Sequence, residues 1–340
     1  MSKPIQIGPV QAGMPVPDRE IIALWKRSFG PEFQLDEALW QQNTAKDPSF
    51  LPSDIILARD GSGTLLGFVV VKIFRDLLNH PGEKLERYAG FGYIAAIAVS
   101  PEQRRKGLGR ELLAQAETYL ADNGATTLYV GESFRHFFPG VPVHNQPALE
   151  FFAGAGYELG TLESDLDGPL DPAFFEPVLK ASNKVTYRQG LPGEEAALLS
   201  FLSRTFPGRW HYDTRLFLEQ GGSIEDVSLV IDLQDQIQGF LLSYKPGDKV
   251  IGPGRYWLNE KPDWGGIGPL GLNKDARGLG AGLGVVAAGM QHLYRHGLKS
   301  ARIDWTTLVD FYGKLGFKPA LTYQRATRPI ISKVKGEDDV

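Results

Sequence analysis

The sequence predicts an α/β fold made of two copies of one domain of about 160 residues. A Gly-rich segment at Arg104–Gly109 recurs 173 residues later, at Arg277–Gly282. Other short segments recur in the same order, such as Phe151-Phe152 and Phe311-Tyr312. Strand-like and helix-like stretches alternate around both Gly-rich segments, which is typical of helices packed on a sheet.

Length and composition narrow the class of protein. The chain has 340 residues, enough for two domains. Its 36 Lys and Arg residues against 40 Asp and Glu residues give a net charge of −4, which argues against nucleic-acid binding because that needs a basic face. The absence of cysteine excludes thiolate catalysis and Cys-ligated zinc. No apolar run reaches the ~18 residues of a membrane span, and no signal-like stretch starts the chain. We expect a cytoplasmic protein without nucleic-acid or membrane partners.

The elements of the first copy follow from periodicity and turn signals. Asp18–Phe29 and Asp36–Gln42 have helical patterns, and an amphipathic helix begins at Leu108. Gly124 ends that helix, because glycine suits the left-handed C-cap position. The expected strands are Ile55–Ala58, Leu65–Phe74, Tyr93–Val99 and Thr126–Val130, with a last helix at Ala148–Ala153.

The second copy repeats this order. Its expected strands are Val227–Asp232, Ile237–Tyr244, Ile267–Leu272 and Ala301–Trp305, and its helices are Glu194–Arg204, Ala281–His296 and Leu308–Leu315. A Pro-rich stretch lies between the copies. We therefore expect a first domain at 1–162, a linker at 163–182 and a second domain at 183–340.

The first copy carries 13 extra residues between its last strand and its last helix. This insertion contains His136 and His144 among several aromatic residues. A loop of this kind can line a substrate cleft, or it can be a surface loop packed on its own aromatic side chains. The six histidines of the chain show no metal-binding spacing, so we predict no metal.

Each Gly-rich segment lies where a buried strand ends and a helix begins. The first N–H groups of a helix have no internal partner and carry partial positive charge, so such a turn binds anions. Glycines let the backbone approach a phosphate closely. A Rossmann fingerprint needs a third glycine and a P-loop needs G-x-x-x-x-G-K-[ST], and neither pattern is present here. Tight strand–helix packing is the alternative explanation for the glycines.

The segment from Val99 to Gly109 resembles the acetyl-CoA signature of the GCN5-related N-acetyltransferase (GNAT) superfamily, V-x-P-x-x-R-R/G-x-G-x-G/A. The second copy retains the Arg277-x-x-Gly280-x-Gly282 core, with Lys274 in place of the usual proline. A second family motif, N-x-x-A-x-x-x-Y/F-x-x-x-G-F/Y, resembles the segment from Asn145 to Tyr157. The tandem arrangement is similar to that of mycothiol synthase-type acetyltransferases. The resemblance implies two GNAT-like domains, each with a mixed, mostly antiparallel sheet whose middle strands splay apart.

The resemblance also implies acetyl-CoA as co-substrate, lying in the splay with its pyrophosphate on the turn amides. The positions that match the cofactor-binding motifs in the first copy are Ile97, Ala98, Val99, Arg104, Arg105, Lys106, Gly107, Leu108, Gly109 and Asn145. In the second copy they are Leu270, Leu272, Arg277, Gly278, Gly280 and Gly282. The acyl group would then point toward Glu132 or Asp304.

Acetyl transfer to an amine needs a polarised thioester carbonyl, a deprotonated amine and a protonated thiolate. The resemblance implies that a strand N–H polarises the carbonyl and that a tyrosine of the last helix protonates the thiolate. The second copy has Tyr312 at that position, whereas the first has Phe152, which cannot donate a proton. The candidate bases are Glu132, Asp304 and Asp310, although each can also be an ordinary solvated or salt-bridged carboxylate.

The sequence thus predicts an N-acetyltransferase that moves an acetyl group from acetyl-CoA to a small-molecule or peptide amine. One copy is expected to be catalytic and the other degenerate, in a monomer or a homodimer. The alternative is a non-catalytic acyl-CoA-binding regulatory module. Release of coenzyme A in the presence of amines separates the two.

Overall fold

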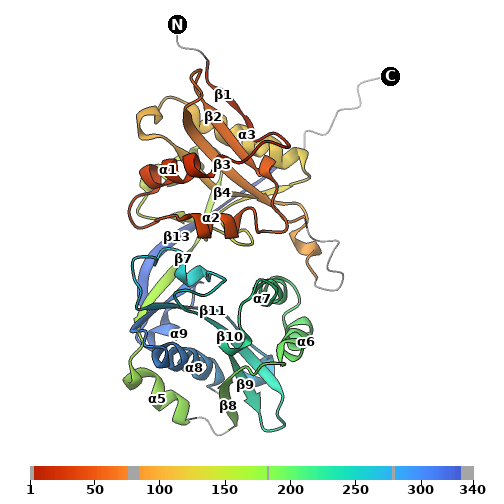
Figure 1. Cartoon of the computed structure of the whole chain (residues 1–340), viewed down its shortest axis with the longest axis vertical. Helices are drawn as coiled ribbons and strands as arrows, with labels where there is room; N and C mark the ends of the chain where they lie inside the picture. Colours follow the sequence, from red (N-terminus) through yellow and green to blue (C-terminus); the bar gives the residue numbers. More distant parts are fainter. Residues whose placement is uncertain (1–3, 76–83, 182–183, 278–279, 331–340) are drawn as a thin grey trace, which may run out of the picture.

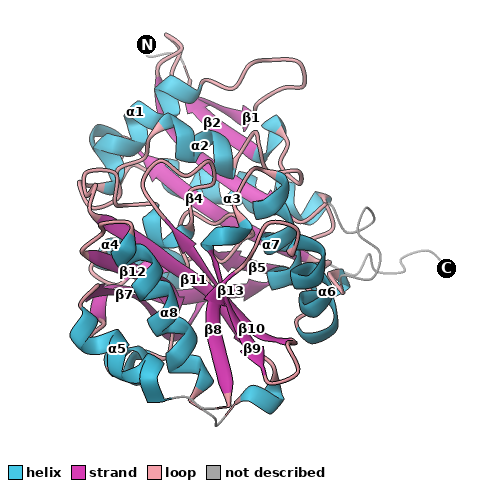
Figure 2. Ribbon diagram, turned by 60° about the horizontal axis from the view of Figure 1, so that its bottom comes forward, coloured by secondary structure: helices cyan, strands magenta, loops and turns pink. Residues whose placement is uncertain are grey.

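The computed structural model describes residues 4–75, 84–181, 184–277 and 280–330. In this part of the chain the strands form one continuous mixed sheet, with the order β1-β2-β3-β4-β5-β13-β7-β12-β11-β10-β9-β8 and the short β6 beside β13. Helices lie on both faces of the sheet (Figure 2). The predicted α/β class with two similar halves is confirmed, and Figure 1 shows one half above the other.

The first half closely follows the predicted order of elements. Its strands are β1 (Gln6–Pro9), β2 (Ile55–Arg59), β3 (Leu65–Ile73), β4 (Phe91–Val99), β5 (Thr127–Val130) and β6 (Val141–Pro142). Its helices are α1 (Asp18–Phe29), α2 (Glu37–Asn43), α3 (Leu108–Asp122) and α4 (Gln146–Gly154). One buried cluster, which includes Trp25 and Trp40, lies under α1 and α2. A second, which includes Leu112 and Leu120, lies under α3.

The second half repeats this plan. Its strands are β8 (Val185–Gln189), β9 (Val227–Asp232), β10 (Ile237–Tyr244), β11 (Trp264–Leu272) and β12 (Ser300–Thr306). Its helices are α6 (Glu195–Thr205), α7 (Arg209–Glu219), α8 (Ala281–Arg295) and α9 (Val309–Gly313). Helices α6 and α7 lie on one face of the sheet and α8 on the other (Figure 1). Helix α9 is shorter than the predicted Leu308–Leu315.

The last strand of each half pairs with strands of the other half. Strand β7 (Glu158–Pro169) follows α4 of the first half but pairs with β12 of the second. Strand β13 (Lys318–Pro329) ends the second half but pairs with β5 of the first. The two strands also pair with each other along most of their length. Tyr323 and Ala326 of β13 are fully buried in the two clusters of the first half, so its core is completed by the end of the chain.

Residues 163–182, the predicted linker, contain regular structure. They comprise most of β7 and helix α5 (Pro172–Ala181), apart from residue 182, which lies outside the described residues. Leu166, Leu170 and Phe175 of this segment are buried in one cluster with α8. Pro169 ends β7 and Pro172 opens α5, where proline is compatible with regular structure, whereas Pro177 lies inside α5.

The two parallel strand pairs, β4–β5 and β11–β12, sit in equivalent places. Pairing of β4 with β5 stops at Ile94 and Val130, although β4 continues to Val99. Pairing of β11 with β12 stops at Ile267 and Ile303. The strands therefore diverge beyond these residues and leave a splay in each half. None of the described helices is both long and apolar enough to cross a membrane.

Candidate active site

A groove in the first half leads from the Gly-rich turn into the splay between β4 and β5. Its outer part, with a volume of about 650 Å³, is lined by the turn, the end of β4 and helix α4. Its inner part, of about 340 Å³, is lined by β4, β5 and the loop that follows α1. Seven residues line both parts, which makes the groove continuous: Ser28, Phe29, Ile97, Asn145, Pro147, Ala148 and Phe152.

The outer part of the groove has the features of an anion site. Gly107 is the N-cap of α3 with φ +94°, and no side chain caps the helix, so its first N–H groups are free to meet a ligand. Arg104, Arg105 and Arg110 line the same space. Arg104 also fixes the entrance, because it donates to the carbonyl oxygens of Val99 at 3.2 Å and Ser28 at 3.1 Å.

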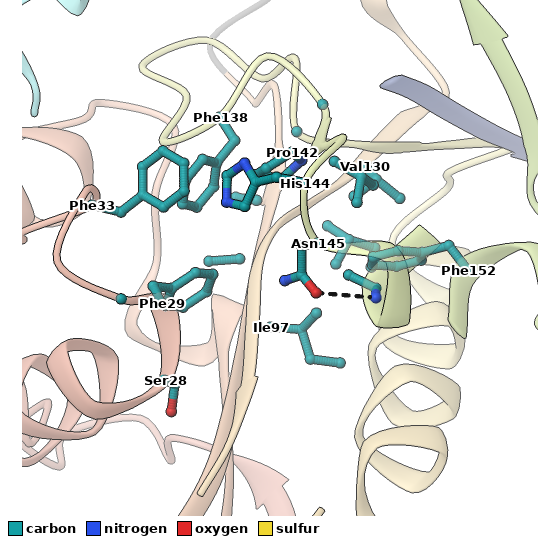
Figure 3. A pocket seen from close by; sticks show the side chains of 18 of the residues that line it. Ser28, Phe29, Phe33, Ile97, Val130, Phe138, Pro142, His144, Asn145 and Phe152 are labelled. Atoms are coloured by element: carbon teal, nitrogen blue, oxygen red, sulfur yellow. Dashed lines mark hydrogen bonds between the residues drawn. The ribbon is translucent and has the colours of Figure 1, made fainter. Parts of the chain in front are cut away.

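Most of the predicted cofactor residues of the first half line this groove: Ile97, Ala98, Val99, Arg104, Arg105, Gly107, Gly109 and Asn145. Two do not present their side chains to it. Leu108 is buried in the core below α3, and the ammonium of Lys106 donates to the carbonyl of Glu102 at 2.7 Å. Asn145 caps α4 by accepting from the Ala148 N–H at 3.3 Å (Figure 3).

The inner part of the groove is mainly apolar and aromatic. Figure 3 shows Phe29, Phe33 and Phe138 on one side and Val130 and Phe152 on the other. The residues that follow α1 are not among the predicted site residues. The one signal for them in the sequence is that Arg27-Ser28-Phe29 resembles Arg204-Thr205-Phe206 of the second copy. Of the two histidines in the insertion, His144 lines the inner part and His136 lies elsewhere.

Strand β4 carries a bulge where it turns away from β5. Val70 and Val71 of β3 pair with Ala96 and Ile94, so Ala95 is an extra residue. Ala95 and Ala96 line the inner part of the groove. In the second half, Gly268 and Pro269 together stand opposite Leu242, between the pairs Leu241–Leu270 and Ser243–Ile267. Proline has no N–H, so Pro269 cannot offer the hydrogen bond that an alanine amide can offer.

The predicted cofactor residues of the second half surround its own turn. Leu270 and Leu272 are on β11 and Arg277 precedes the turn. Gly280 is the N-cap of α8 with φ +75°, and Gly282 lies in the first turn of that helix, close to Phe311. Gly278 lies outside the described residues. The two turns are therefore similar in backbone conformation at the helix start.

Asp304 and Tyr312 both lie in the second half, whereas Glu132 lies at the seam between the halves. Asp304 is near the bulge of β11 and 3.9 Å from the Nε2 of His136. Burial and the charge of Asp304 raise the pKa of Tyr312 to about 12. Both carboxylate oxygens of Glu132 are held by Arg325, at 2.8 and 2.9 Å. Glu132 is not among the residues that line either part of the groove.

Three carboxyl groups at the seam between the halves have raised pKa values, and Asp304 is one of them. Burial raises the pKa of Asp165 to about 6, and burial with the charge of Asp165 raises the pKa of Asp304 to about 7. Burial with the charge of Glu132 raises the pKa of Glu163 to about 7. Asp165 accepts from the Trp305 N–H at 3.0 Å and the Tyr323 hydroxyl at 3.0 Å. Among the described residues no group of three His, Asp or Glu side chains is arranged to hold a metal.

The raised pKa of Asp304 predicts how stability depends on pH. The folded state holds a proton on Asp304 up to about pH 7, whereas the unfolded chain releases it near pH 4, so this group lowers the free energy of unfolding as the pH rises. His136 acts in the opposite direction, because burial lowers its pKa. We compare the free energy of unfolding of Asp304→Asn with that of the wild type. We expect this difference to shift in favour of the variant by at least about 1 kcal/mol from pH 6 to pH 8. Urea unfolding at both pH values measures this gain, and an equal difference at the two pH values would contradict it.

Comparison with known proteins agrees with the geometry. The model of the acetyltransferase (GNAT) family matches residues 19–157 and 197–317. The chain is 30% identical to a mycothiol acetyltransferase of Geodermatophilus obscurus over 244 residues, 66% of this chain and 70% of that protein. It is 26% identical to a mycothiol acetyltransferase of Saccharopolyspora erythraea over 280 residues, 78% of this chain and 82% of that protein.

Two solved structures share the tandem fold. The GCN5-related glucosamine N-acetyltransferase region of a fungal multi-domain GH3 β-N-acetylglucosaminidase superposes with a TM-score of 0.81 at 23% identity, covering 96% of this chain and 38% of that chain. A tandem GNAT protein of the clavulanic acid biosynthesis pathway superposes with a TM-score of 0.64 at 17% identity, covering 96% and 98%. The chain therefore belongs to the acetyltransferase (GNAT) family, as a tandem member of this family of N-acetyltransferases.

Proposed function

We propose that the chain transfers the acetyl group of acetyl-CoA to the amine of an amino sugar, with the chemistry in its first half. The observation that carries this proposal is the continuous groove from the Arg104–Gly109 turn to the splay between β4 and β5. The groove offers helix N–H groups and arginines at one end and a mainly apolar cavity at the other. This polarity suits a cofactor with a pyrophosphate at one end of its extended arm and a thioester at the other.

Acetyl-CoA would lie with its pyrophosphate at the N-terminus of α3 and its pantetheine arm along Ile97–Val99. The thioester would then reach the bulge of β4 at Ala95 and Ala96, where a backbone N–H group of the bulge would polarise its carbonyl. Members of the family use acetyl-CoA. The proline at the equivalent place in β11 supports placing the chemistry in the first half.

An amino sugar as acceptor is supported by the wall of the inner cavity and by the relatives. Phe29, Phe33 and Phe138 line that cavity, and aromatic rings pack on the apolar face of a sugar ring. The related structures include a protein described as a glucosamine N-acetyltransferase. Incubation with acetyl-CoA and glucosamine tests the proposal, with mass spectrometry of the product. Binding of acetyl-CoA without any acetylated amine would favour the non-catalytic binding module instead.

Chemistry in the first half excludes the predicted role of Tyr312 as the acid, because Tyr312 lies in the second half. One variant distinguishes the two assignments. Tyr312 is almost fully buried in the core of the second half, far along the chain from the groove. We expect Tyr312→Phe to keep the turnover number within about twofold of the wild type, because the ring and its packing remain. A loss of tenfold or more at unchanged acetyl-CoA affinity would move the chemistry to the second half.

A further inference from the structure

We propose that His144 accepts the proton of the substrate amine in the first half, and that Glu32 orients it for this role. The inference rests on the proposed function, because it assigns the base of the same reaction. The two residues come from separate parts of the chain. Glu32 lies in the loop after α1, and His144 lies in the insertion between β6 and α4. The insertion is absent from the second half, so this pair has no counterpart there.

The contacts of His144 hold its ring at the inner cavity. Its Nε2 is 3.0 Å from Oε1 of Glu32. Its ring stacks on Phe33, with 6.0 Å between ring centroids and an interplanar angle of 15°. The side chain is half exposed, so a substrate can reach it. Figure 3 shows the ring near Phe138 and Pro142, above Asn145.

His144 lines the same cavity as the bulge of β4, and a base for this reaction has to lie close to the place assigned to the thioester. The cavity that it lines is also lined by Ala95, Ala96, Val130 and Gly131, which surround the splay. An amine that enters this cavity therefore meets both His144 and the place assigned to the thioester. Phe152 stands where a proton-donating tyrosine is usual, so the proton chemistry of this cavity has to come from another side chain.

The hydrogen bond to Glu32 determines which ring nitrogen of His144 keeps a free lone pair. An ionised carboxylate only accepts hydrogen bonds, so Nε2 must donate its hydrogen to Glu32 and the lone pair remains on Nδ1. The negative charge of Glu32 also stabilises the imidazolium that forms when Nδ1 takes a proton. Glu32 and His144 are the titratable groups among the residues that line the inner part of the groove. The outer part adds Arg104, Arg105, Arg110 and Glu150.

The reaction begins with deprotonation of the substrate amine. The ammonium of the substrate gives one proton to Nδ1 of His144, which leaves a neutral amine and an imidazolium. The nitrogen lone pair attacks the thioester carbonyl, so a C–N bond forms. The C–S bond then breaks and its electron pair leaves on the thiolate of coenzyme A. The thiolate takes up the proton held by the imidazolium, which restores neutral His144, and the nitrogen releases its second proton to solvent.

The other histidine of the insertion does not fit this role. His136 is buried at the seam, beside Asp304 and Trp305, and does not line the groove. Burial and the charge of Arg209 lower its pKa well below the usual range. His136 is therefore a neutral part of the packing between the halves, which leaves His144 as the histidine that a substrate can meet.

The test is the pH dependence of acetylation by His144→Gln, with glucosamine as acceptor. We expect kcat/KM at pH 7 to fall at least about a hundredfold, which is the usual effect of losing a positioned base. The deficit should shrink to below about tenfold at pH 9, because more of the amine is then already neutral. Glu32→Gln should lose about tenfold at pH 7, because the imidazolium loses its negative partner. Calorimetry should give unchanged acetyl-CoA affinity for both variants.

His296→Gln is the matched control, because His296 is an exposed histidine at the end of α8, outside the groove. A His144→Gln variant within threefold of the wild type at pH 7 would overturn the inference, and so would a loss that is equal at pH 7 and pH 9. A loss of acetyl-CoA affinity would also overturn it, because His144 would then serve binding. A wild-type chain that does not acetylate glucosamine contradicts the proposed function itself, so the two failures are distinct.

Discussion

Replacing Gly107 by aspartate is expected to weaken the binding of acetyl-CoA at least about tenfold, which is about 1.4 kcal/mol. Gly107 opens α3 at the anion end of the groove. An aspartate there brings a negative charge to the site assigned to the pyrophosphate, and it competes for the helix N–H groups as a capping side chain. Apart from its neighbours along the chain, no atom of the described residues lies within 4 Å of the added Cβ, so the cost to folding is limited to the left-handed φ.

Gly280→Asp provides a matched control for this measurement. Gly280 has the same place at the start of α8, a similar φ of +75° and equally open space around its Cβ position. Both variants therefore carry about the same backbone strain and the same charge. Calorimetric titration with acetyl-CoA should show the loss for Gly107→Asp and near wild-type affinity for Gly280→Asp. The reverse result would place the cofactor in the second half, and equal losses would indicate a site in each half.

The sequence predicts the elements within each copy well, because these depend on local signals. Helix α1 and strands β9 and β10 have the predicted bounds, since each is a strongly periodic segment with a turn at its ends. The Gly-rich turn and the end of β4 also line one groove, and binding of the cofactor there stays a prediction. These residues are neighbours in the sequence, so a motif of eleven residues is enough to bring them together.

The parts that the sequence does not predict depend on contacts between distant segments. Strands β7 and β13 exchange places between the halves, and no local pattern distinguishes a strand that pairs within its own copy from one that crosses. The pairing of Glu32 with His144 joins residues 112 positions apart. Glu132 was a candidate base, but its partner Arg325 comes from the exchanged strand at the other end of the chain.

Lys72 is another residue whose role only the fold reveals. It lies on β3 with its side chain buried, and its ammonium reaches into the insertion of the first half. It donates to Oδ2 of Asp47 at 2.8 Å and to the carbonyl oxygens of Phe134 at 3.1 Å and Arg135 at 2.8 Å. Burial lowers the pKa of Lys72, and the charge of Asp47 opposes that shift. The insertion that it anchors continues to Phe138 and Gly140, which line the inner cavity.

Lys72→Met is therefore expected to lower the free energy of unfolding by about 3–5 kcal/mol, because it leaves the carboxylate of Asp47 buried without its cation. Methionine fills a similar volume, so the effect comes from the lost charge and hydrogen bonds. Adding Asp47→Asn should restore part of the loss, since an asparagine can still accept from the Ser49 N–H while carrying no charge. Urea unfolding of the wild type and of the single and double variants measures both effects. A single variant within 1 kcal/mol of the wild type would show that the insertion is held by its aromatic packing, and the Lys72 contacts would then add little to it.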